Sequence, residues 1–183
     1  MVRRFCVAAV SLIALASCSA AGDVSVAVTT VRPNTFRIAV HTEIQAPRSA
    51  VWRVITDYNH HADFLPYMAR SVELSRRNAA VDVLQEIRFH IVFWPFTLRA
   101  RLHITEDPDH HMHFASVGGD YRRLEGDWTL GTAPTQSETT DVRCEFLVEP
   151  KRSAPEWIVR LAAKRYLAAM VKRLRERVEE TSR

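Results

Sequence analysis

Apolar and polar residues alternate along much of the chain between Thr35 and Pro150, which is the pattern of strands with one buried face. Turn residues separate the alternating segments. We therefore expect about six or seven strands. The apolar residues that share a phase are Phe36, Ile38, Val40 and Ile44, then Val72 and Leu74, then Val83, Ile87, Phe89, Ile91 and Phe93, then Leu98, Ala100, Leu102 and Ile104, then Leu124, Trp128 and Leu130, and last Val142, Cys144, Phe146 and Val148.

A turn at Asp107–Asp109 predicts a hairpin and therefore the residues that face each other across it. A hairpin centred on this turn places Leu102 opposite Phe114 on the apolar face. On the polar face it places His103 opposite His113. The apolar and polar sides of the hairpin are thus expected to separate cleanly.

The longest helical pattern runs from Ala154 to Glu180. Its apolar residues recur at spacings of three and four, so they form one stripe, and charged residues occupy the other side. An amphipathic helix of this kind needs an apolar surface to cover, and the predicted strands supply one. The residues of the stripe are Val159, Ala163, Tyr166, Leu167, Met170, Val171, Leu174 and Val178.

Two short helices are expected between the first strand and the others. Arg48–Asp57 follows Pro47, which suits a first helical position, and a second helix is expected at about Ala62 to Met68 with Pro66 inside it. This order lacks a repeating βαβ pattern and a Gly-rich phosphate loop, which disfavours a doubly wound nucleotide-binding fold. It predicts an α+β fold in which a curved antiparallel sheet wraps around the long C-terminal helix and leaves a cavity between them.

The first residues have the pattern of an export signal. Two arginines precede an apolar run of about a dozen residues, which is too short to span a bilayer. Leu15–Cys18 resembles the lipobox of bacterial lipoproteins, in which the cysteine is diacylated. We expect residues 1–17 to be a signal peptide, Cys18 to be lipidated and residues 18–34 to form a tether. Simple secretion after cleavage near Ala20 or Ala21 is the alternative.

Composition and charge narrow the possible partners. The 183 residues suffice for one domain, and 47% hydrophobic with 25% charged residues is ordinary globular usage, which argues against disorder. The net charge of +4 is too modest to indicate nucleic acid. Arginines do gather between 152 and 177, where they form either a solvated helix face or a contact with an anionic membrane.

Three segments resemble the helix-grip START-like superfamily, which includes polyketide cyclases and coenzyme Q-binding START-domain proteins. They are Val51–Tyr58 followed by Phe64–Pro66, Gly119–Trp128, and Val148–Pro150. The resemblance implies that residues 35–183 form one domain that holds an apolar ligand between the curved sheet and the terminal helix. It also implies that many such domains lack catalytic residues, and it leaves open which lipid, quinone or polyketide-like compound is bound.

We predict the ligand-binding residues from the inward phase, the helix stripe and the segment that the resemblance places beside the cavity mouth. They are Tyr58, Phe64, Leu65, Gln85, Ile87, Phe89, Leu102, Phe114, Trp128, Phe146, Tyr166 and Met170. We predict no cofactor.

Few polar residues share the inward phase, and this favours a binding protein over an enzyme. Gln85, Thr42, Ser116 and Cys144 are the inward polar residues identified, and none has an inward His, Asp or Glu beside it. We therefore predict no catalytic residue. The alternatives are a cyclase-like or hydrolytic enzyme in which Gln85, Thr42 or Tyr58 orients the substrate, and an envelope assembly partner with a vestigial cavity.

The remaining candidates have ordinary structural interpretations. His103 and His113 fall on the outward phase beside arginines, so we predict no metal site there. Cys144 is expected to be a small core residue rather than a reactive thiol. Three apolar residues at the start of the terminal helix lie off its main stripe and are expected either to seal the cavity mouth or to touch lipid; they are Trp157, Ile158 and Leu161.

Overall fold

The computed structural model describes residues 24–182 apart from 92, 134–137 and 154. The predicted signal peptide and Cys18 lie outside the described residues. The strands are β1 Ser25–Arg32, β2 Thr35–Ile44, β3 Met68–Arg77, β4 Ala80–Ile91, β5 Trp94–Asp107, β6 His111–Gly119, β7 Tyr121–Thr132 and β8 Thr140–Pro150. The helices are α1 Arg48–Ile55, the 3₁₀ turn η1 Tyr58–His60, α2 His61–Phe64, α3 Glu156–Ala162, the π turn η2 Ala163–Leu167 and α4 Ala168–Thr181.

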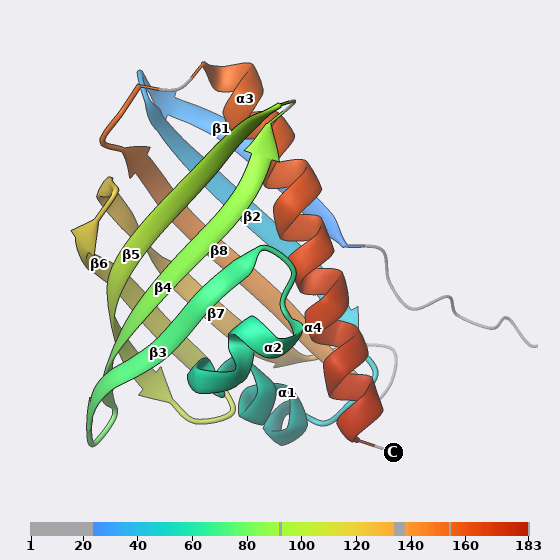
Figure 1. The fold of residues 1–183 in the computed structure, drawn as a ribbon. Coiled ribbons are helices and arrows are strands. Elements are labelled where there is room, and N and C mark those ends of the chain that lie inside the picture. Colours follow the sequence, from blue (N-terminus) through green and yellow to red (C-terminus); the bar gives the residue numbers. More distant parts are fainter. Residues whose placement is uncertain (1–23, 92, 134–137, 154, 183) are drawn as a thin grey trace, which may run out of the picture.

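All eight strands belong to one antiparallel sheet with the order β1-β2-β8-β7-β6-β5-β4-β3. The sheet curves around the long C-terminal helix, and α1 and α2 lie at the end of the molecule near the C-terminus (Figure 1). Register shifts within several strand pairs add local twist and bend. The α+β helix-grip prediction is confirmed, with eight strands in the described residues in place of the six or seven expected.

The additional strand is β1, and it corrects the prediction that residues 18–34 form only a tether. Val28 pairs with Ile38 of β2 and is the only described β1 residue that is fully buried. The guanidinium of Arg160 in α3 donates a 2.6 Å hydrogen bond to the Val28 carbonyl oxygen. The alternation of Val24, Val26 and Val28 with smaller or polar residues was a strand signal in the sequence that the tether prediction missed.

The predicted pairing between β5 and β6 was displaced by two residues. Leu102 lies opposite Ser116, and Phe114 lies opposite Ile104. The hairpin closes at Asp107 and His111, so its loop has three residues with Asp109 at φ 64°. His103 therefore does not face His113, although a shift of two residues keeps each side chain on its predicted face.

The second short helix begins and ends earlier than predicted. Helix α2 covers His61–Phe64, and Leu65 already has extended dihedral angles of φ −76° and ψ 123°. The physical reason is Pro66, because the ring of a proline disfavours helical geometry in the preceding residue. The chain therefore leaves the helix before Met68, which is the first residue of β3.

The terminal helix runs continuously over Glu156–Thr181 but contains a π turn at Ala163–Leu167. The insertion of a wider turn changes the phase of α3 relative to α4. On α4, Val171, Leu174 and Val178 are buried as the stripe predicted. Among the described residues, no helix is long and apolar enough to cross a membrane.

Candidate functional site

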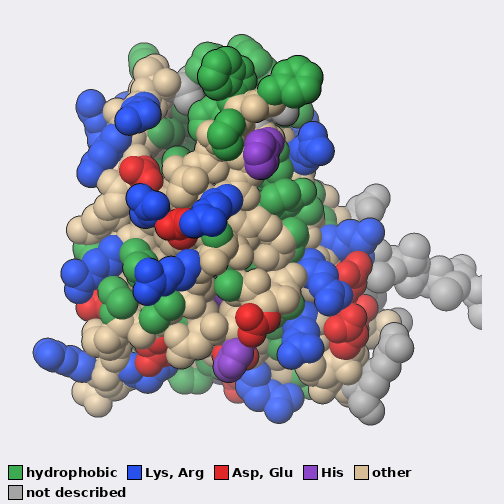
Figure 2. All heavy atoms as spheres, viewed as in Figure 1, with side chains coloured by type: hydrophobic (Ala, Val, Ile, Leu, Met, Phe, Trp, Pro, Cys, Tyr) green, Lys and Arg blue, Asp and Glu red, His purple; other side chains and the backbone are tan. Residues whose placement is uncertain are grey.

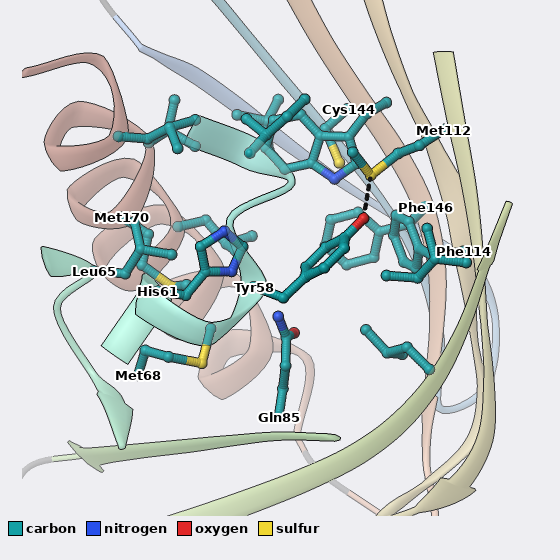
Figure 3. A pocket seen from close by; sticks show the side chains of 18 of the residues that line it. Tyr58, His61, Leu65, Met68, Gln85, Met112, Phe114, Cys144, Phe146 and Met170 are labelled. Atoms are coloured by element: carbon teal, nitrogen blue, oxygen red, sulfur yellow. Dashed lines mark hydrogen bonds between the residues drawn. The ribbon is translucent and has the colours of Figure 1, made fainter. Parts of the chain in front are cut away.

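A cavity of about 200 Å³ lies between the sheet, the α1–α2 segment and the terminal helix. Its walls come from β2 and β4–β8 on one side and from α4 with the residues around α2 on the other. Figure 3 shows side chains from these elements converging on a common space. An apolar cavity of about 150 Å³ in another protein is large enough to hold benzene, so this one can accept a small apolar molecule or part of a larger one.

The structure brings eight of the twelve predicted ligand-binding residues to the cavity wall. They are Tyr58, Leu65, Gln85, Leu102, Phe114, Trp128, Phe146 and Met170. Their contact with a ligand remains a prediction, but their position at one space is observed.

The other four predicted residues lie outside the cavity lining. Phe64 packs against the main core, and Ile87 packs against a second, smaller cluster formed by Phe89 and Tyr166. The ring centroids of Phe89 and Tyr166 are 4.8 Å apart, and the Tyr166 hydroxyl donates to the carbonyl oxygen of His90. Tyr166 lies within the π turn, and the spacing of the stripe did not predict this turn. The Tyr166 ring packs the helix against β4.

Several residues that line the cavity were not among the predicted ligand-binding residues. Most of them lie on the inward face of a strand or on the helix stripe, which are the two patterns from which that prediction was made. The signal for them was therefore present in the sequence. The apolar ones are Val40, Ile55, Met68, Ile104, Met112, Leu124, Cys144, Leu167, Val171 and Leu174. The polar addition is His61, whose position depends on where α2 begins.

Glu106 is a buried inward carboxylate that the sequence interpretation missed. It has the same strand phase as Leu102 and Ile104, so its orientation could have been predicted from β5 alone. Its Oε1 accepts a 2.8 Å hydrogen bond from the Tyr58 hydroxyl, and its Oε2 lies 2.7 Å from Nη1 of Arg76. The buried charge is thus both paired and hydrogen-bonded, as a stable buried carboxylate must be.

This arrangement makes the Tyr58 hydroxyl a weaker acid than that of a solvent-exposed tyrosine. Burial, followed by the hydrogen bond and charge of Glu106, raises the pKa of the Tyr58 hydroxyl well above its usual value. The Arg76 guanidinium also lies 6.0 Å from the centre of the Tyr58 ring. Tyr58 therefore remains a neutral hydrogen-bond donor whose proton is directed at Glu106.

His61 is a second polar residue of the cavity and is only 6% exposed. Its Nε2 lies 3.3 Å from the carbonyl oxygen of Val54 in α1, while its buried Nδ1 has no hydrogen-bond partner among the described residues. The ring edges of Tyr58 and Phe64 pack around it, with centroids 5.6 and 5.8 Å away. Burial lowers the pKa of the His61 imidazole, so the neutral form is favoured.

The four inward polar residues predicted from the strands have different environments. Gln85 lines the cavity, and its amide nitrogen is 3.5 Å from Ser71 Oγ. Cys144 also lines the cavity, and burial raises the pKa of its thiol well above the usual value, which makes a thiolate unfavourable. Thr42 and Ser116 are not in the cavity lining, and the Ser116 hydroxyl donates to the Gly118 carbonyl oxygen at 3.0 Å.

The outward histidines are paired with carboxylates on the convex side of the sheet. His103 Nδ1 lies 2.9 Å from Asp82, and both His111 and His113 lie within hydrogen-bond distance of Asp127. Throughout the described part of the chain there is no group of three or more His, Cys, Asp and Glu residues arranged to hold a metal ion.

One end of the molecule exposes large apolar side chains. Phe93, between β4 and β5, is 89% exposed, and Trp94, the first residue of β5, is 73% exposed. Trp157 and Leu161 of α3 are also exposed. Hydrophobic side chains gather at this end in the space-filling view, above the β4–β5 turn and α3 (Figure 2). The sequence placed Phe93 on the inward phase of a strand, but β4 ends before it. We call Phe93, Trp94, Trp157 and Leu161 the apolar end.

Known proteins share both sequence features and the fold with this chain. A family model described as polyketide cyclase/dehydrase and lipid transport matches residues 44–175. The search of curated proteins found no match.

Solved structures share the fold over most of their length. A protein from Thermus thermophilus is 20% identical, with a TM-score of 0.68 over 80% of this chain and 99% of its own. A STAR-related lipid transfer protein from Xanthomonas axonopodis is 18% identical, with a TM-score of 0.68 over 85% of this chain and 98% of its own. The Zhui aromatase/cyclase from a Streptomyces species is 16% identical, with a TM-score of 0.66 over 81% of this chain and 96% of its own. At these identities the similarity concerns the fold.

Proposed function

This chain belongs to the polyketide cyclase/dehydrase and lipid transport family, and on that premise we propose that it binds, and carries between membranes or partners of the cell envelope, a hydrophobic small molecule. The observation that carries the proposal is the cavity of about 200 Å³ with a predominantly apolar wall. Burial of apolar ligand surface there supplies roughly 25 cal/mol per Å², so affinity does not require many hydrogen bonds.

The proposed role is binding without chemical conversion. A catalytic mechanism needs a nucleophile or a base that is ready to accept a proton. The Tyr58 hydroxyl and the Cys144 thiol both have strongly raised pKa values, and the Tyr58 proton is held by Glu106. Glu106 itself is occupied by Tyr58 and Arg76.

A cyclase-like activity is the second candidate function. It is supported by the aromatase/cyclase among the similar folds and by the neutral His61 in the cavity wall. His61 is the one cavity residue whose ring nitrogen could take a proton from a bound substrate near neutral pH. The predicted roles of Gln85 and Tyr58 as orienting groups would then apply to that substrate. An assembly partner with a vestigial cavity is disfavoured by the open volume.

The cellular location is also part of the proposal. The lipobox-like Leu15–Cys18 supports a lipoprotein held at a membrane of the bacterial cell envelope, because two acyl chains give stable anchoring. A periplasmic or secreted protein is the alternative if Cys18 is not acylated. Since β1 begins at Ser25, the proposed tether can include only residues before this strand.

The apolar end supports a direct contact with the membrane surface. Tryptophan and phenylalanine side chains are suited to the interface between water and lipid tails. Lys164 and Arg165, in the π turn beside α3, are exposed and make no ion pair with a described residue, so they are available to anionic head groups. Ile158 is packed inward against the Phe89 and Tyr166 cluster, whereas its neighbours Trp157 and Leu161 remain exposed.

Native mass spectrometry and organic extraction of the purified protein test the proposed function. We expect a stoichiometric apolar compound that is released chemically unchanged. Met170→Trp should reduce its occupancy by narrowing the cavity, whereas Lys172→Trp places the same ring on the exposed helix face two residues away and should not. Recovery of a transformed product with turnover, abolished in His61→Gln, would favour the cyclase-like alternative. Equal occupancy in both tryptophan variants would contradict binding in this cavity.

A further inference from the structure

The cavity has one buried polar atom that the protein leaves unpaired. His61 Nδ1 is inaccessible to solvent and has no donor within hydrogen-bond distance among the described residues. A buried polar group without a partner costs about 1–3 kcal/mol. Such an atom needs a physical explanation, and a residue of the cavity wall can obtain its partner from what binds there.

The contacts of the imidazole determine which role this nitrogen takes. Nε2 lies 3.3 Å from the Val54 carbonyl oxygen, which can only accept, so Nε2 carries the proton. In the neutral ring, Nδ1 is then a hydrogen-bond acceptor. The ring cannot easily turn away, because it packs edge-on against Tyr58 and Phe64.

The neighbouring polar groups leave this acceptor unmatched. The Tyr58 hydroxyl is directed at Glu106, at 2.8 Å, and does not donate to His61. The Gln85 carboxamide extends into the same space from β4, towards the side of the cavity from which Tyr58 and His61 enter it (Figure 3). Its amide nitrogen has only a long contact of 3.5 Å with Ser71 Oγ, so it can also donate to a bound group.

We propose that His61 Nδ1, assisted by Gln85, is the polar anchor of the cavity and selects apolar ligands that carry a hydroxyl group. A ligand hydroxyl donates to His61 Nδ1 and accepts from the Gln85 amide, while the apolar body fills the remaining volume. A ligand of the same shape without the hydroxyl leaves Nδ1 unpaired. A quinone-like ligand with only carbonyl acceptors has the same defect, so hydroxylated forms are preferred. This inference rests on the proposed binding function.

Two ligands of nearly equal shape test the anchor. 2-Naphthol and 2-methylnaphthalene differ by a hydroxyl in place of a methyl group, and calorimetric titration gives their affinity ratio for each protein. Hydration of the free ligands cancels when this ratio is compared between variants. A hydrogen bond of ordinary strength predicts that the ratio in favour of 2-naphthol falls about 3- to 10-fold when the anchor is removed.

Two variants remove the acceptor in different ways. His61→Phe keeps an aromatic ring against Tyr58 and Phe64, and His61→Leu keeps a smaller apolar side chain, so neither variant can accept a hydrogen bond from the ligand. If the phenylalanine protein does not fold, the leucine protein still reports the ratio. Met170→Leu is the matched control, because it changes an apolar wall residue and should alter both affinities alike.

The outcomes separate the anchor from the proposed function. A lower ratio in both His61 variants and an unchanged ratio in Met170→Leu support the anchor. An equal ratio in the wild-type and His61 proteins overturns the anchor. A tightly held water that pairs with Nδ1 would give this same result. Binding of neither ligand to the wild-type protein would instead contradict the proposed binding function.

Discussion

Tyr58, which lines the cavity, and Glu106, 48 residues later in the sequence, are joined by a hydrogen bond of 2.8 Å. Tyr58 lies in the turn after α1, and Glu106 lies near the end of β5. Arg76 of β3 holds the second oxygen of the carboxylate at 2.7 Å. The three residues tie the helical segment to one side of the sheet, so we interpret them as a structural clamp that keeps the cavity open.

The clamp makes a prediction about stability. Tyr58→Phe removes a hydrogen bond to a buried carboxylate and should lower the free energy of unfolding by about 1.5–3 kcal/mol, measured by urea denaturation. The ratio of the affinities for 2-naphthol and 2-methylnaphthalene should stay within about twofold of the wild-type value, because the Tyr58 hydroxyl donates to Glu106 and not to the ligand.

Glu106→Gln provides the complementary test of the clamp. It keeps the side-chain shape but removes the buried charge that Arg76 contacts, while the ion pair between Arg76 and Glu73 remains, so it should also be destabilising. Additive losses in the Tyr58→Phe, Glu106→Gln double variant would contradict the clamp, since residues in one network are expected to be coupled.

The close approach of β7 to β8 depends on Gly126. A Cβ atom at this position would lie 2.2 Å from the Glu145 carbonyl oxygen and 2.3 Å from the Phe146 Cβ. Gly126→Ala must therefore push β7 away from β8, and we expect a loss of at least about 2 kcal/mol in unfolding free energy. Gly131→Ala on the same strand is the control, because its nearest contacts are 3.7 Å or longer. Equal stability of the two variants would show that the close approach is unimportant.

His61 makes stability depend on pH. Its pKa is lowered in the fold by burial, so the unfolded chain binds the proton more readily. The resulting penalty is absent above the ordinary value of 6.5 and grows as the pH falls below it. We expect the melting temperature to fall between pH 7 and 5 more steeply in the wild-type protein than in His61→Gln.

The pKa of the neighbouring His60 is shifted in the opposite direction, so His60 serves as a control. The hydrogen bond from His60 to Asp57 raises the pKa of this exposed imidazole. Its contribution is present below pH 6.5 and is lost as the pH rises through the folded pKa. His60→Gln should therefore lower the melting temperature below pH 6.5 without changing the slope of the acid-side decline, whereas His61→Gln should make that slope shallower. A melting temperature that is unchanged below pH 6.5 in His60→Gln, or a slope that is unchanged in His61→Gln, would refute the corresponding assignment.

The apolar end predicts binding to anionic vesicles. In a Cys18→Ser protein, which removes the proposed anchor, the double substitution of Phe93 and Trp94 by serine should weaken sedimentation with phosphatidylglycerol-containing vesicles at least about 10-fold. Leu74→Ser changes an exposed apolar residue of β3 and should have little effect. Unchanged binding in the double variant would remove the apolar end as the membrane contact.

The proposed lipid anchor has its own test. Cys18→Ser should shift the protein from the membrane fraction to the soluble fraction of the cell envelope, because the residual contact through the apolar end is reversible. Unchanged membrane fractionation would show that acylation of Cys18 is not the cause of the association.

Much of the fold was predictable because strand and helix periodicity depend only on local spacing. The inward phase of Leu102 and Ile104 and the stripe residues Val171 and Leu174 are buried as predicted. Pro66 also contained the signal that ends α2 early, and the phase of β5 contained the signal for Glu106. These two features were missed although the residues themselves indicate them.

Only the tertiary structure decided the remaining features, because each depends on contacts between segments far apart in the chain. The edge strand β1 exists through its pairing with β2, and the three-residue loop before His111 determines the register of β6. The cavity lining likewise required the sheet to close around the helix, which set Tyr166 into a packing cluster instead of the site. The sequence alone determined that an amphipathic helix covers an apolar sheet face. Packing then determined that His61, with its unpaired nitrogen, lies in the cavity wall, since a residue's phase within a short helix does not specify which buried space it reaches.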